Sequence, residues 1–400
     1  MRSSMPRSKN MPKNIDTVEE FWSWDTIRRA QKNANEKSIV RFLEEFLGFL
    51  GTPESIARCF PSGHSALETL LVTRKDNTTG VMAPAFNCRR VQDAVEESGC
   101  TLKTYDFSPE PGSFDWQAVE EAVTPEIGVI IVTHYYGVPV DLREIRDFCR
   151  EREIILIEDC AHTLGGYVGE HQVGTWGDAA IFSFNYDKPI SLGWGGLGVV
   201  NSLGRFRCED FLVDEHVPPD LDVEISSLDK FVKTMEARRS SIPQGKNKVS
   251  RDFSRLLNKM TRLPVSKNQN SFGRIQAELG SLCLESYSDV RSIRNNNACL
   301  FASLCPQPTW SVGSSVVHPA WLKQKMFVPS SEKLAMISSE LKLQGVRAGN
   351  FNWPKLIEGA THQSCPNAEE VTTCWMDVPI HQRMSSEEIR SVVSLVKRYF

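Results

Sequence analysis

The sequence feature that most constrains the fold is an unbroken run of branched apolar residues, Ile154–Ile157, that ends in two acidic residues. A run of this length and composition predicts a strand buried on both faces of a parallel sheet. Glu158 and Asp159 follow at its carboxyl end. Ligands of open α/β sheets bind beyond the carboxyl ends of the strands, so we expect these carboxylates to face a crevice rather than the core.

A second apolar strand is predicted at 179–184, and it ends in a polar turn that contains Lys188. The return into Val199 is rich in glycine, at Gly193, Gly195, Gly196 and Gly198. A strand, a loop with one lysine and a tight glycine hairpin could hold an amine at the sheet edge to which Asp159 points. A carboxylate and a lysine amine near one cofactor ring suggest pyridoxal phosphate chemistry.

Predicted strands and helices alternate before this stretch, which implies a mostly parallel sheet with helices on both faces. We expect strands at 80–83, 102–105 and 129–133, and helices at 90–97, 116–122 and 142–150. A helix capped by Asp16 and Thr17 is expected to run through Trp24, and a second to span 39–47. The C-terminal part predicts a long helix to about Leu304, a strand at 326–328, a helix at 332–343 and a closing helix at 387–400.

These elements predict two domains after a leader. Residues 1–13 have the composition of a disordered segment, and residues 14–270 form a large cofactor-binding domain. A polar, charged stretch at about 203–267, with helical patterning at 228–238 and 253–260, interrupts it as a divergent insertion. Residues 271–400 supply the linking helix and a small C-terminal α/β domain.

The composition of the chain excludes several classes of function. The chain has 400 residues, 40% of them hydrophobic, and a formal net charge of −4, which argues against nucleic acid or an acidic membrane as the main partner. No apolar run approaches the roughly eighteen residues needed to cross a bilayer. The eleven cysteines are scattered without a Cys-x-x-Cys pair, and no apolar signal segment follows Met1. We therefore expect reduced thiols in a cytoplasmic protein.

Four motifs within forty residues occur in an order that resembles the DegT/DnrJ/EryC1/StrS family. They are Glu158-Asp159-Cys160-Ala161-His162, Gly174-Thr175-Trp176-Gly177-Asp178, Ser183-Phe184, and Lys188 before the glycines. Further similar segments are Phe60–Glu68, Pro84–Cys88, His134–Asp141 and Asp377–His381, so that the resemblance covers roughly 35–200 and 270–400. The family consists mostly of pyridoxal-phosphate-dependent aminotransferases of fold type I that act on nucleotide-linked keto-sugars. The resemblance implies this fold, with a mostly parallel seven-stranded-type sheet and a smaller C-terminal domain.

The resemblance also assigns roles to residues. It makes Lys188 the lysine that carries the cofactor, Asp159 the partner of the pyridine nitrogen, His162 a residue against the ring face, and Ser183 a phosphate ligand. The remaining cofactor contacts that it implies are Gly63, His64 and Ser65 around the phosphate, Phe86 and Cys88 at the ring, and Asn270 from a second subunit. From the residues alone, Asp159 could instead cap a helix, and His162 could be a packed core histidine.

Three departures from the family pattern concern the substrate mouth. Cys88 stands where the family usually has a stacking aromatic residue, Trp194 stands where it usually has glutamate, and no arginine precedes Phe272. We therefore expect amino-group transfer to a keto or aldehyde acceptor, a keto-sugar or a specialised small metabolite, with less reliance on a nucleotide diphosphate. The alternative is that Arg262, Arg274 or Lys267 supplies the missing charge.

Three other functions are alternatives to this one. A nicotinamide dehydrogenase needs Gly-x-Gly-x-x-Gly directly after a strand, and no such placement occurs. Dehydratases of the family replace the lysine with histidine, so Lys188 favours transamination. A non-catalytic regulatory relative also stays open. The expected partners are a small amine donor, a carbonyl acceptor and a second copy in a homodimer, with no metal.

Overall fold

The computed structural model describes residues 14–20, 22–74, 78–106, 108, 110–206, 211, 217–240, 271–350, 356–357 and 364–400. The expected leader at 1–13, the expected helix at 253–260 and Asn270 lie outside the described residues.

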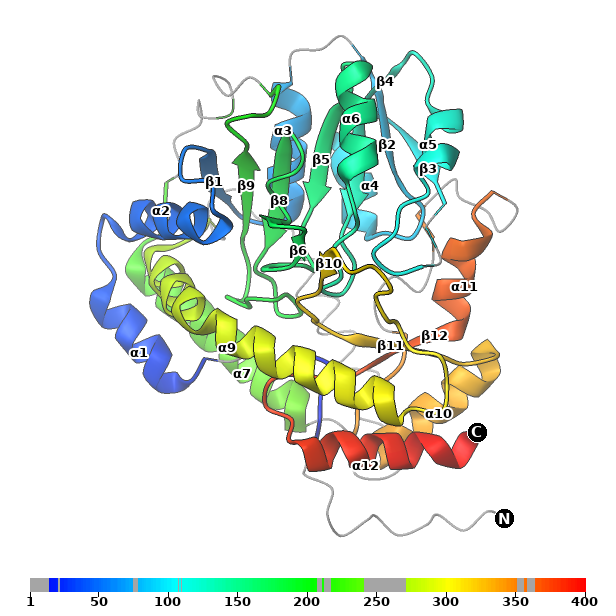
Figure 1. Cartoon of the computed structure of the whole chain (residues 1–400). Coiled ribbons are helices and arrows are strands. Elements are labelled where there is room, and N and C mark those ends of the chain that lie inside the picture. Colours follow the sequence, from blue (N-terminus) through cyan, green and yellow to red (C-terminus); the bar gives the residue numbers. More distant parts are fainter. Residues whose placement is uncertain are drawn as a thin grey trace.

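A seven-stranded sheet in the order β1-β9-β8-β5-β4-β2-β3 forms the centre of the molecule (Figure 1). Strands β8, β5, β4, β2 and β3 pair in parallel, and β9 is antiparallel to both of its neighbours. This arrangement confirms the predicted fold class. The strands span β1 Ile56–Phe60, β2 Gly80–Pro84, β3 Thr101–Tyr105, β4 Ile127–Thr133, β5 Ile155–Asp159, β8 Ala179–Ser183 and β9 Gly196–Val200.

Helices cover both faces of this sheet because its strands are apolar on both sides. Along β4, Val129 and Ile131 pack with helices α3 and α4, whereas Ile130 and Val132 lie in the core beneath α5 and α6. On this second face the β8 and β9 end is covered by α2 and α9. The helices span α2 Ser38–Leu50, α3 Gly63–Thr73, α4 Arg89–Glu97, α5 Trp116–Ala122, α6 Arg143–Glu151 and α9 Arg274–Leu304.

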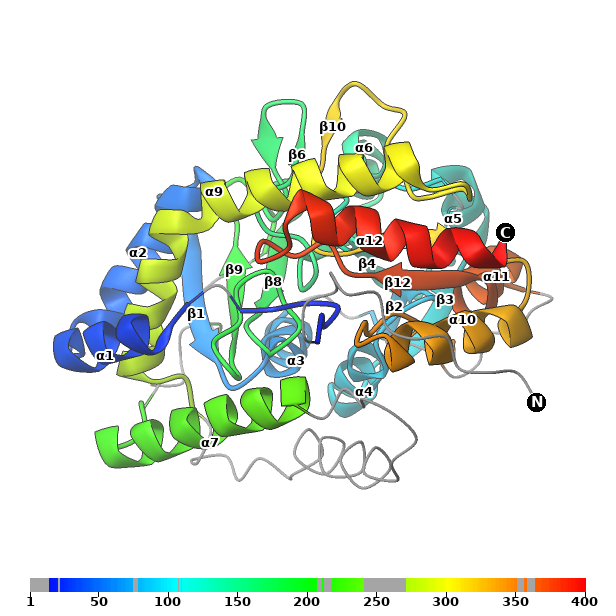
Figure 2. The same ribbon diagram turned by 90° about the horizontal axis from the view of Figure 1, so that it is seen from below.

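The C-terminal part forms a smaller unit beside the long helix α9 (Figure 2). Its antiparallel pair, β11 Gln324–Phe327 and β12 Trp375–Val378, packs with α10 Ser331–Leu343, α11 Pro366–Cys374 and α12 Ser386–Val396, which a 3-10 turn at Lys397–Tyr399 follows. Helix α12 lies beside α9 in both views. A second small sheet joins β6 Tyr167–Val168, β7 His171–Gln172 and β10 Val317–His318. The predicted long helix, strand and two following helices are confirmed here, but α11 and β12 had not been predicted.

The prediction of an N-terminal helix capped by Asp16 and Thr17 was wrong, whereas the helix expected at 39–47 is confirmed as α2. Helix α1 spans Trp24–Asn33, and its N-cap is Ser23, whose hydroxyl accepts a hydrogen bond from Thr26 N–H. Asp16 caps no helix: it is buried, and its carboxylate pairs with Arg238 at 2.7 Å and with Arg347 at 3.7 Å. Arg238 belongs to α7, Leu221–Ser240, which contains the helix expected at 228–238. The N-terminal segment is therefore tied to α7 and to the C-terminal unit by charge.

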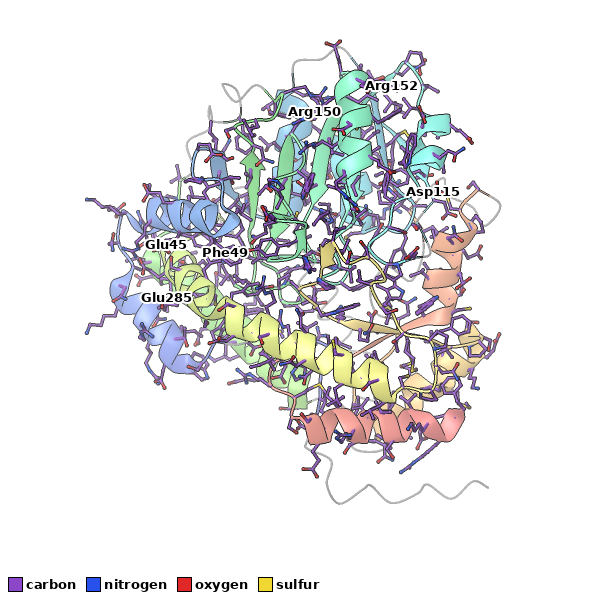
Figure 3. The ribbon with its side chains drawn as sticks, viewed as in Figure 1. Glu45, Phe49, Asp115, Arg150, Arg152 and Glu285 are labelled. Atoms are coloured by element: carbon purple, nitrogen blue, oxygen red, sulfur yellow. The ribbon has the colours of Figure 1, made fainter. Side chains whose placement is uncertain are left out.

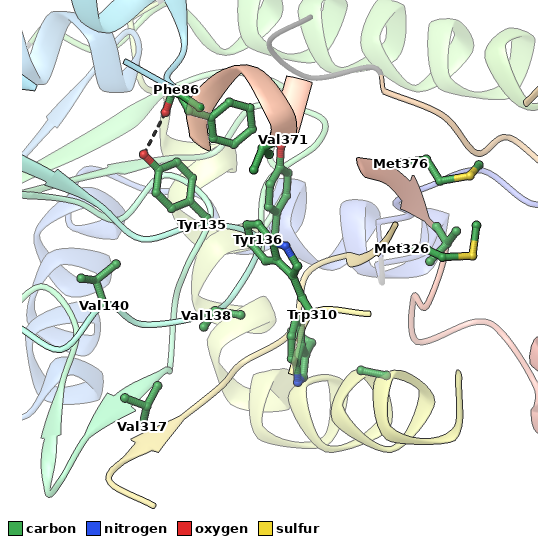
Figure 4. Close-up of a cluster of buried hydrophobic side chains, with 14 of the residues drawn as sticks. Phe86, Tyr135, Tyr136, Val138, Val140, Trp310, Val317, Met326, Val371 and Met376 are labelled. Atoms are coloured by element: carbon green, nitrogen blue, oxygen red, sulfur yellow. Dashed lines mark hydrogen bonds between the residues drawn. The ribbon is translucent and has the colours of Figure 1, made fainter. Parts of the chain in front are cut away.

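One apolar core connects the seven-stranded sheet to the C-terminal unit (Figure 4). Phe86 and Tyr135, from the ends of β2 and β4, share it with Met326 of β11 and Met376 of β12. The Tyr135 hydroxyl donates to Phe86 O at 2.8 Å. Because the core is shared, the C-terminal unit is packed directly against the sheet edge at which the candidate site lies. The boundary at 270 stays a prediction.

Arg150 and Arg152, at the end of α6 where the chain turns into β5, mark the opposite edge of the sheet (Figure 3). Phe49 of α2 packs edge-on against Tyr287 of α9, with ring centroids 5.9 Å apart. Within the described ranges, no helix is both long and apolar enough to span a membrane.

Candidate active site

Asp159 lies at the carboxyl end of β5, as predicted, and is 3% exposed. Its Oδ1 accepts the Ala161 N–H at 3.0 Å, and its Oδ2 accepts the Thr133 hydroxyl at 3.3 Å. Burial raises the pKa of Asp159, against the opposing effects of the Ala161 N–H and the Lys188 charge. A carboxylate in this position gains from a cationic partner, because such a partner restores the charged form that burial disfavours.

The neighbouring Glu158 is structural. Its two oxygens accept the N–H groups of Gly174, Trp176 and Gly177 at 2.7 to 2.8 Å. A fourth bond comes from His134 Nε2, 3.0 Å away; His134 Nδ1 accepts the Val140 N–H, so that Nε2 is the donor. Two adjacent acidic residues thus point to opposite sides of β5, as successive strand residues do. Glu158 fixes the Gly174–Asp178 turn, and Asp159 faces the sheet edge.

Lys188 lies in the turn after β8, and its Nζ is 3.6 Å from Asp187 Oδ1. Burial favours a higher pKa for Asp187, but Lys188, Lys323 and Arg238 together hold it below its usual range. The Lys188 charge also acts on Asp159 and His162. The lysine and the aspartate chosen from the sequence are therefore within electrostatic range of each other at one edge of the sheet.

A cradle suited to an anion lies beside Ser183, the last residue of β8. The N-terminus of α3 begins at Gly63, and the Ser62 hydroxyl caps it by accepting the Ser65 N–H. A Cβ on Gly63 would come within 3.3 Å of Ser183 Cβ, and one on Gly196 would come within 2.3 Å of Gly63 N. The glycines thus let a helix N-terminus and a hydroxyl approach each other, and helix N-termini favour phosphate.

The structure places the other predicted cofactor contacts as follows. The His64 ring is directed toward α4, with Nδ1 2.8 Å from Arg90 O and Nε2 2.8 Å from Glu97 Oε2, so only its main chain belongs to the cradle. Cys88 is the N-cap of α4, and burial raises the pKa of its thiol while the Lys188 charge opposes the rise. Phe86 is fully buried against Tyr135.

His162 is buried, and its ring lies 5.2 Å from that of Tyr136 at an interplanar angle of 35°. Burial, with the charges of Lys188 and Lys323, holds the pKa of His162 well below its usual range. The imidazole is therefore neutral at physiological pH and offers a flat apolar face. Tyr136 itself has a left-handed backbone, φ +53°, which non-glycine residues adopt at a cost of about 1–3 kcal/mol and which is common at functional sites.

Several residues of this site were not predicted from the sequence. Asn87 donates to Thr133 Oγ1 at 3.0 Å, and Thr133 in turn donates to Asp159, so a two-step chain fixes the carboxylate. Lys323 and Lys325 reach the same region from the C-terminal unit and pair with Asp377. The sequence signal was the placement of two lysines, with Gln324 between them, between the apolar pairs Trp321-Leu322 and Met326-Phe327.

The residues present fit pyridoxal phosphate. Buried Asp159 would meet a pyridine nitrogen, the glycine-lined cradle would take the phosphate, and Lys188, which acts electrostatically on Asp159, offers an amine. A Cβ on Gly63 or Gly196 would fill the cradle, and burial of Asp159 without a full counter-charge is relieved by a protonated ring nitrogen.

Comparison with known proteins identifies relatives. A sequence model of the DegT/DnrJ/EryC1/StrS aminotransferase family matches residues 15–203. Among curated proteins, GDP-perosamine synthase of Vibrio cholerae is 29% identical over 191 residues, 47% of this chain and 51% of that protein. L-glutamine:2-deoxy-scyllo-inosose aminotransferase of Micromonospora echinospora is 30% identical over 246 residues, 60% of this chain and 55% of that protein. The chain thus spans about half the length of the curated relatives it matches.

Solved structures extend the likeness in fold to nearly the whole chain. Helicobacter pylori PseC, an aminotransferase involved in pseudoaminic acid biosynthesis, superposes with a TM-score of 0.73 at 18% identity, over 97% of this chain and 99% of PseC. A putative sugar aminotransferase of Streptococcus pneumoniae, solved in its PLP form, superposes with a TM-score of 0.71 at 17% identity, over 97% and 100% of the two chains. Residues 15–203 therefore match the DegT/DnrJ/EryC1/StrS aminotransferase family, and the solved structures show that nearly the whole chain shares the fold of these aminotransferases.

Proposed function

We propose that this chain is a pyridoxal-phosphate-dependent aminotransferase that moves an amino group to a keto or aldehyde acceptor in biosynthesis. The acceptor class is a keto-sugar or a specialised small metabolite. The observation that carries the proposal is the convergence of Asp159, Lys188 and the cradle of Gly63 and Ser183 at one sheet edge. The family match supports the reaction class.

Each of these residues has its own role in the proposed reaction. When bound, pyridoxal phosphate supplies the sink for the electron pair released at the substrate carbon. Asp159, oriented by Thr133, keeps the ring nitrogen protonated. Lys188 would hold the cofactor and, once displaced, would take the proton from the substrate carbon and deliver it to the cofactor, so that the amino group remains with the cofactor. His162 packs against the ring face as a neutral group, because a cation there would oppose the protonated ring.

The substrate mouth differs from the usual family pattern, and this supports an unusual acceptor. Trp194 anchors the start of α9: its Nε1 donates to Ser271 O at 3.4 Å, and its carbonyl accepts Gln276 Nε2 at 3.1 Å. Arg274, one candidate for the missing cation, is engaged with Glu36 at 2.9 Å. Arg262 and Lys267 lie outside the described residues. We infer less reliance on a diphosphate group than in relatives that act on nucleotide sugars.

We also propose a homodimer in the cytoplasm, with Asn270 entering the partner's site. Helix α7 supports an interface, since Leu221 and Ile225 are exposed one turn apart on it. Light scattering at assay concentration tests the dimer. A fully active monomer would contradict it.

Activity is tested by loading the purified protein with pyridoxal phosphate and adding amine donors one at a time. Loss of the visible absorption of the bound cofactor, restored by a carbonyl acceptor, is the result expected of an aminotransferase. Binding without any donor response would instead favour a non-catalytic regulator, and response without amino transfer would favour a dehydratase. The acceptors are then ranked with a panel of nucleotide keto-sugars and free keto acids. If the nucleotide keto-sugars react much faster, the inference of less reliance on a diphosphate group is wrong.

A further inference from the structure

Two buried lysines share one carboxylate beside the candidate active site. Lys323 and Lys325 are 1% and 0% exposed; Lys325 lies in β11, and Lys323 immediately precedes that strand. Their ammonium groups lie 3.9 Å and 2.9 Å from the two oxygens of Asp377 on β12. Lysine is almost never fully buried unless it is paired. Two such residues together therefore indicate a binding site for anionic groups.

Main-chain hydrogen bonds hold this pair against the sheet edge. Leu322 N–H donates to Tyr136 O at 2.8 Å, and Ala320 N–H donates to Gly137 O at 2.7 Å. Gly137 has φ +93°, and a Cβ there would lie 2.1 Å from Ala320 O, so only glycine permits this contact. The β11 segment and the turn after β4 are thereby fixed to each other.

The ammonium groups face the site through Tyr136. Lys325 Nζ lies 4.7 Å from the centre of that ring and Lys323 Nζ 5.7 Å from it, while the His162 ring lies 5.2 Å from it. Lys323 also acts electrostatically on Asp187, the neighbour of Lys188 in the chain. Both lysines therefore belong to the region where a substrate would meet Lys188.

The charges of this cluster do not balance. Two ammonium groups share Asp377, and the other nearby carboxylate, Asp187, pairs with Lys188 at 3.6 Å. Among the described residues, neither Lys325 Nζ nor the Asp377 oxygens have a partner with hydrogen-bond geometry, in spite of the 2.9 Å approach. Buried charge is costly unless it is paired and hydrogen-bonded. A further anion would supply both the missing charge and the missing bonds.

We propose that Lys323 and Lys325 bind the carboxylate group of a substrate, which makes the substrate class a small amino or keto acid. The inference rests on the proposed function and adds the anchoring group. A carboxylate at the lysines leaves the other end of a short substrate free to reach Lys188. The anchor serves the amine donor, the acceptor or both, and the last experiment separates these cases.

Binding is measured first, without any reaction. Isothermal titration calorimetry of the protein supplied with pyridoxal phosphate compares glutarate with its uncharged diamide, glutaramide. We expect glutarate to bind at least about tenfold more tightly, which corresponds to about 1.4 kcal/mol, and Lys323→Met to remove that preference. Lys233→Met, at an exposed position on α7, is the matched control and should leave it unchanged.

The Asp377→Asn variant should change the affinity for glutarate in the direction opposite to the lysine variants. Removing the carboxylate that both lysines share should tighten glutarate binding, whereas a purely structural role for Asp377 predicts weaker binding. Equal affinity for glutarate and glutaramide in the unmodified protein overturns the proposal, and so does a glutarate preference that survives both Lys323→Met and Lys325→Met. Circular dichroism of each variant confirms that it is folded.

Single-turnover measurements then identify the source of the carboxylate. A rate loss in Lys323→Met confined to amino acids assigns the anchor to the donor, a loss confined to keto acids assigns it to the acceptor, and a loss in both assigns it to both. Rates unchanged for both classes overturn the substrate assignment. Because calorimetry needs no turnover, a protein that fails to transaminate but binds glutarate through Lys323 would refute the proposed function and leave the anion site standing.

Discussion

Replacing each of the two adjacent acidic residues of β5 by its amide tests the division between structure and chemistry. Glu158→Gln keeps the shape but puts an NH2 group where a carboxylate oxygen accepts main-chain N–H groups. The four bonds to Glu158 come from Gly174, Trp176, Gly177 and His134. At least two of them are lost, each worth about 1.5–3 kcal/mol when the acceptor is charged. We expect the free energy of unfolding to fall by about 3–5 kcal/mol, as for other buried charged networks that lose one partner.

Asp159→Asn should behave in the opposite way. Burial raises the pKa of Asp159, so the ionised form is disfavoured in the protein without cofactor. A group whose pKa is raised by folding contributes stability at low pH that is lost as pH rises, and asparagine removes that loss. The free energy of unfolding at pH 7 should therefore change by less than about 1 kcal/mol or increase, whereas amino transfer should be abolished.

Urea unfolding followed by tryptophan fluorescence, without added cofactor, measures both variants against the unmodified protein. Equal destabilisation by Asp159→Asn and Glu158→Gln, or a Glu158→Gln variant as stable as the unmodified chain, would contradict this division of roles.

Three further predictions follow from buried charges and from close packing. Folding raises the pKa of Glu224 from 4.5 to about 7, mainly through burial. The stability that Glu224 contributes below pH 4.5 is therefore lost as pH rises to about 7. In Glu224→Gln, the fall in the free energy of unfolding between pH 4.5 and 7, measured by urea unfolding, should be smaller by up to about 3 kcal/mol. Burial favours a higher pKa for Asp16, but Arg238 and Arg347 lower it from 3.8 to about 2. Asp16→Asn should therefore lower the free energy of unfolding by about 2 kcal/mol at pH 7, and urea unfolding should show this loss shrink as pH falls below 3.8. Gly196→Ala would force a Cβ to 2.3 Å from a backbone nitrogen; thermal unfolding should show a loss of about 1–3 kcal/mol, with weaker binding of pyridoxal phosphate in a titration.

The sequence predicted those parts of the fold and site that depend on local pattern. Continuous apolar runs identified β5 and β8, and in a parallel sheet the ends of such strands must meet at one edge, which brought Asp159 and Ser183 together. The side-chain direction of His64 could not be predicted in this way, because its ring is fixed by Glu97 on another helix.

Long-range charge pairs were the other feature that could not be predicted from the sequence. Asp16 and Thr17 resemble a helix cap, but Asp16 is bound by Arg238, 222 residues away, and that tertiary contact overrides the local preference. Likewise, Lys325 and Asp377 lie on different strands of a small sheet, and nothing in either local sequence specifies that pairing. Whether Cys88, Trp194 and the missing arginine change the substrate stays a prediction.

The most direct test of the central claim is to find which lysine carries the cofactor. The protein is incubated with pyridoxal phosphate, reduced with borohydride, digested and mapped by mass spectrometry, with Lys188→Ala as the control. We expect a stoichiometric cofactor adduct on Lys188 and none in the control. An adduct on Lys323, Lys325 or any other lysine, or no adduct at all, would contradict the assignment of Lys188 and with it the proposed aminotransferase chemistry.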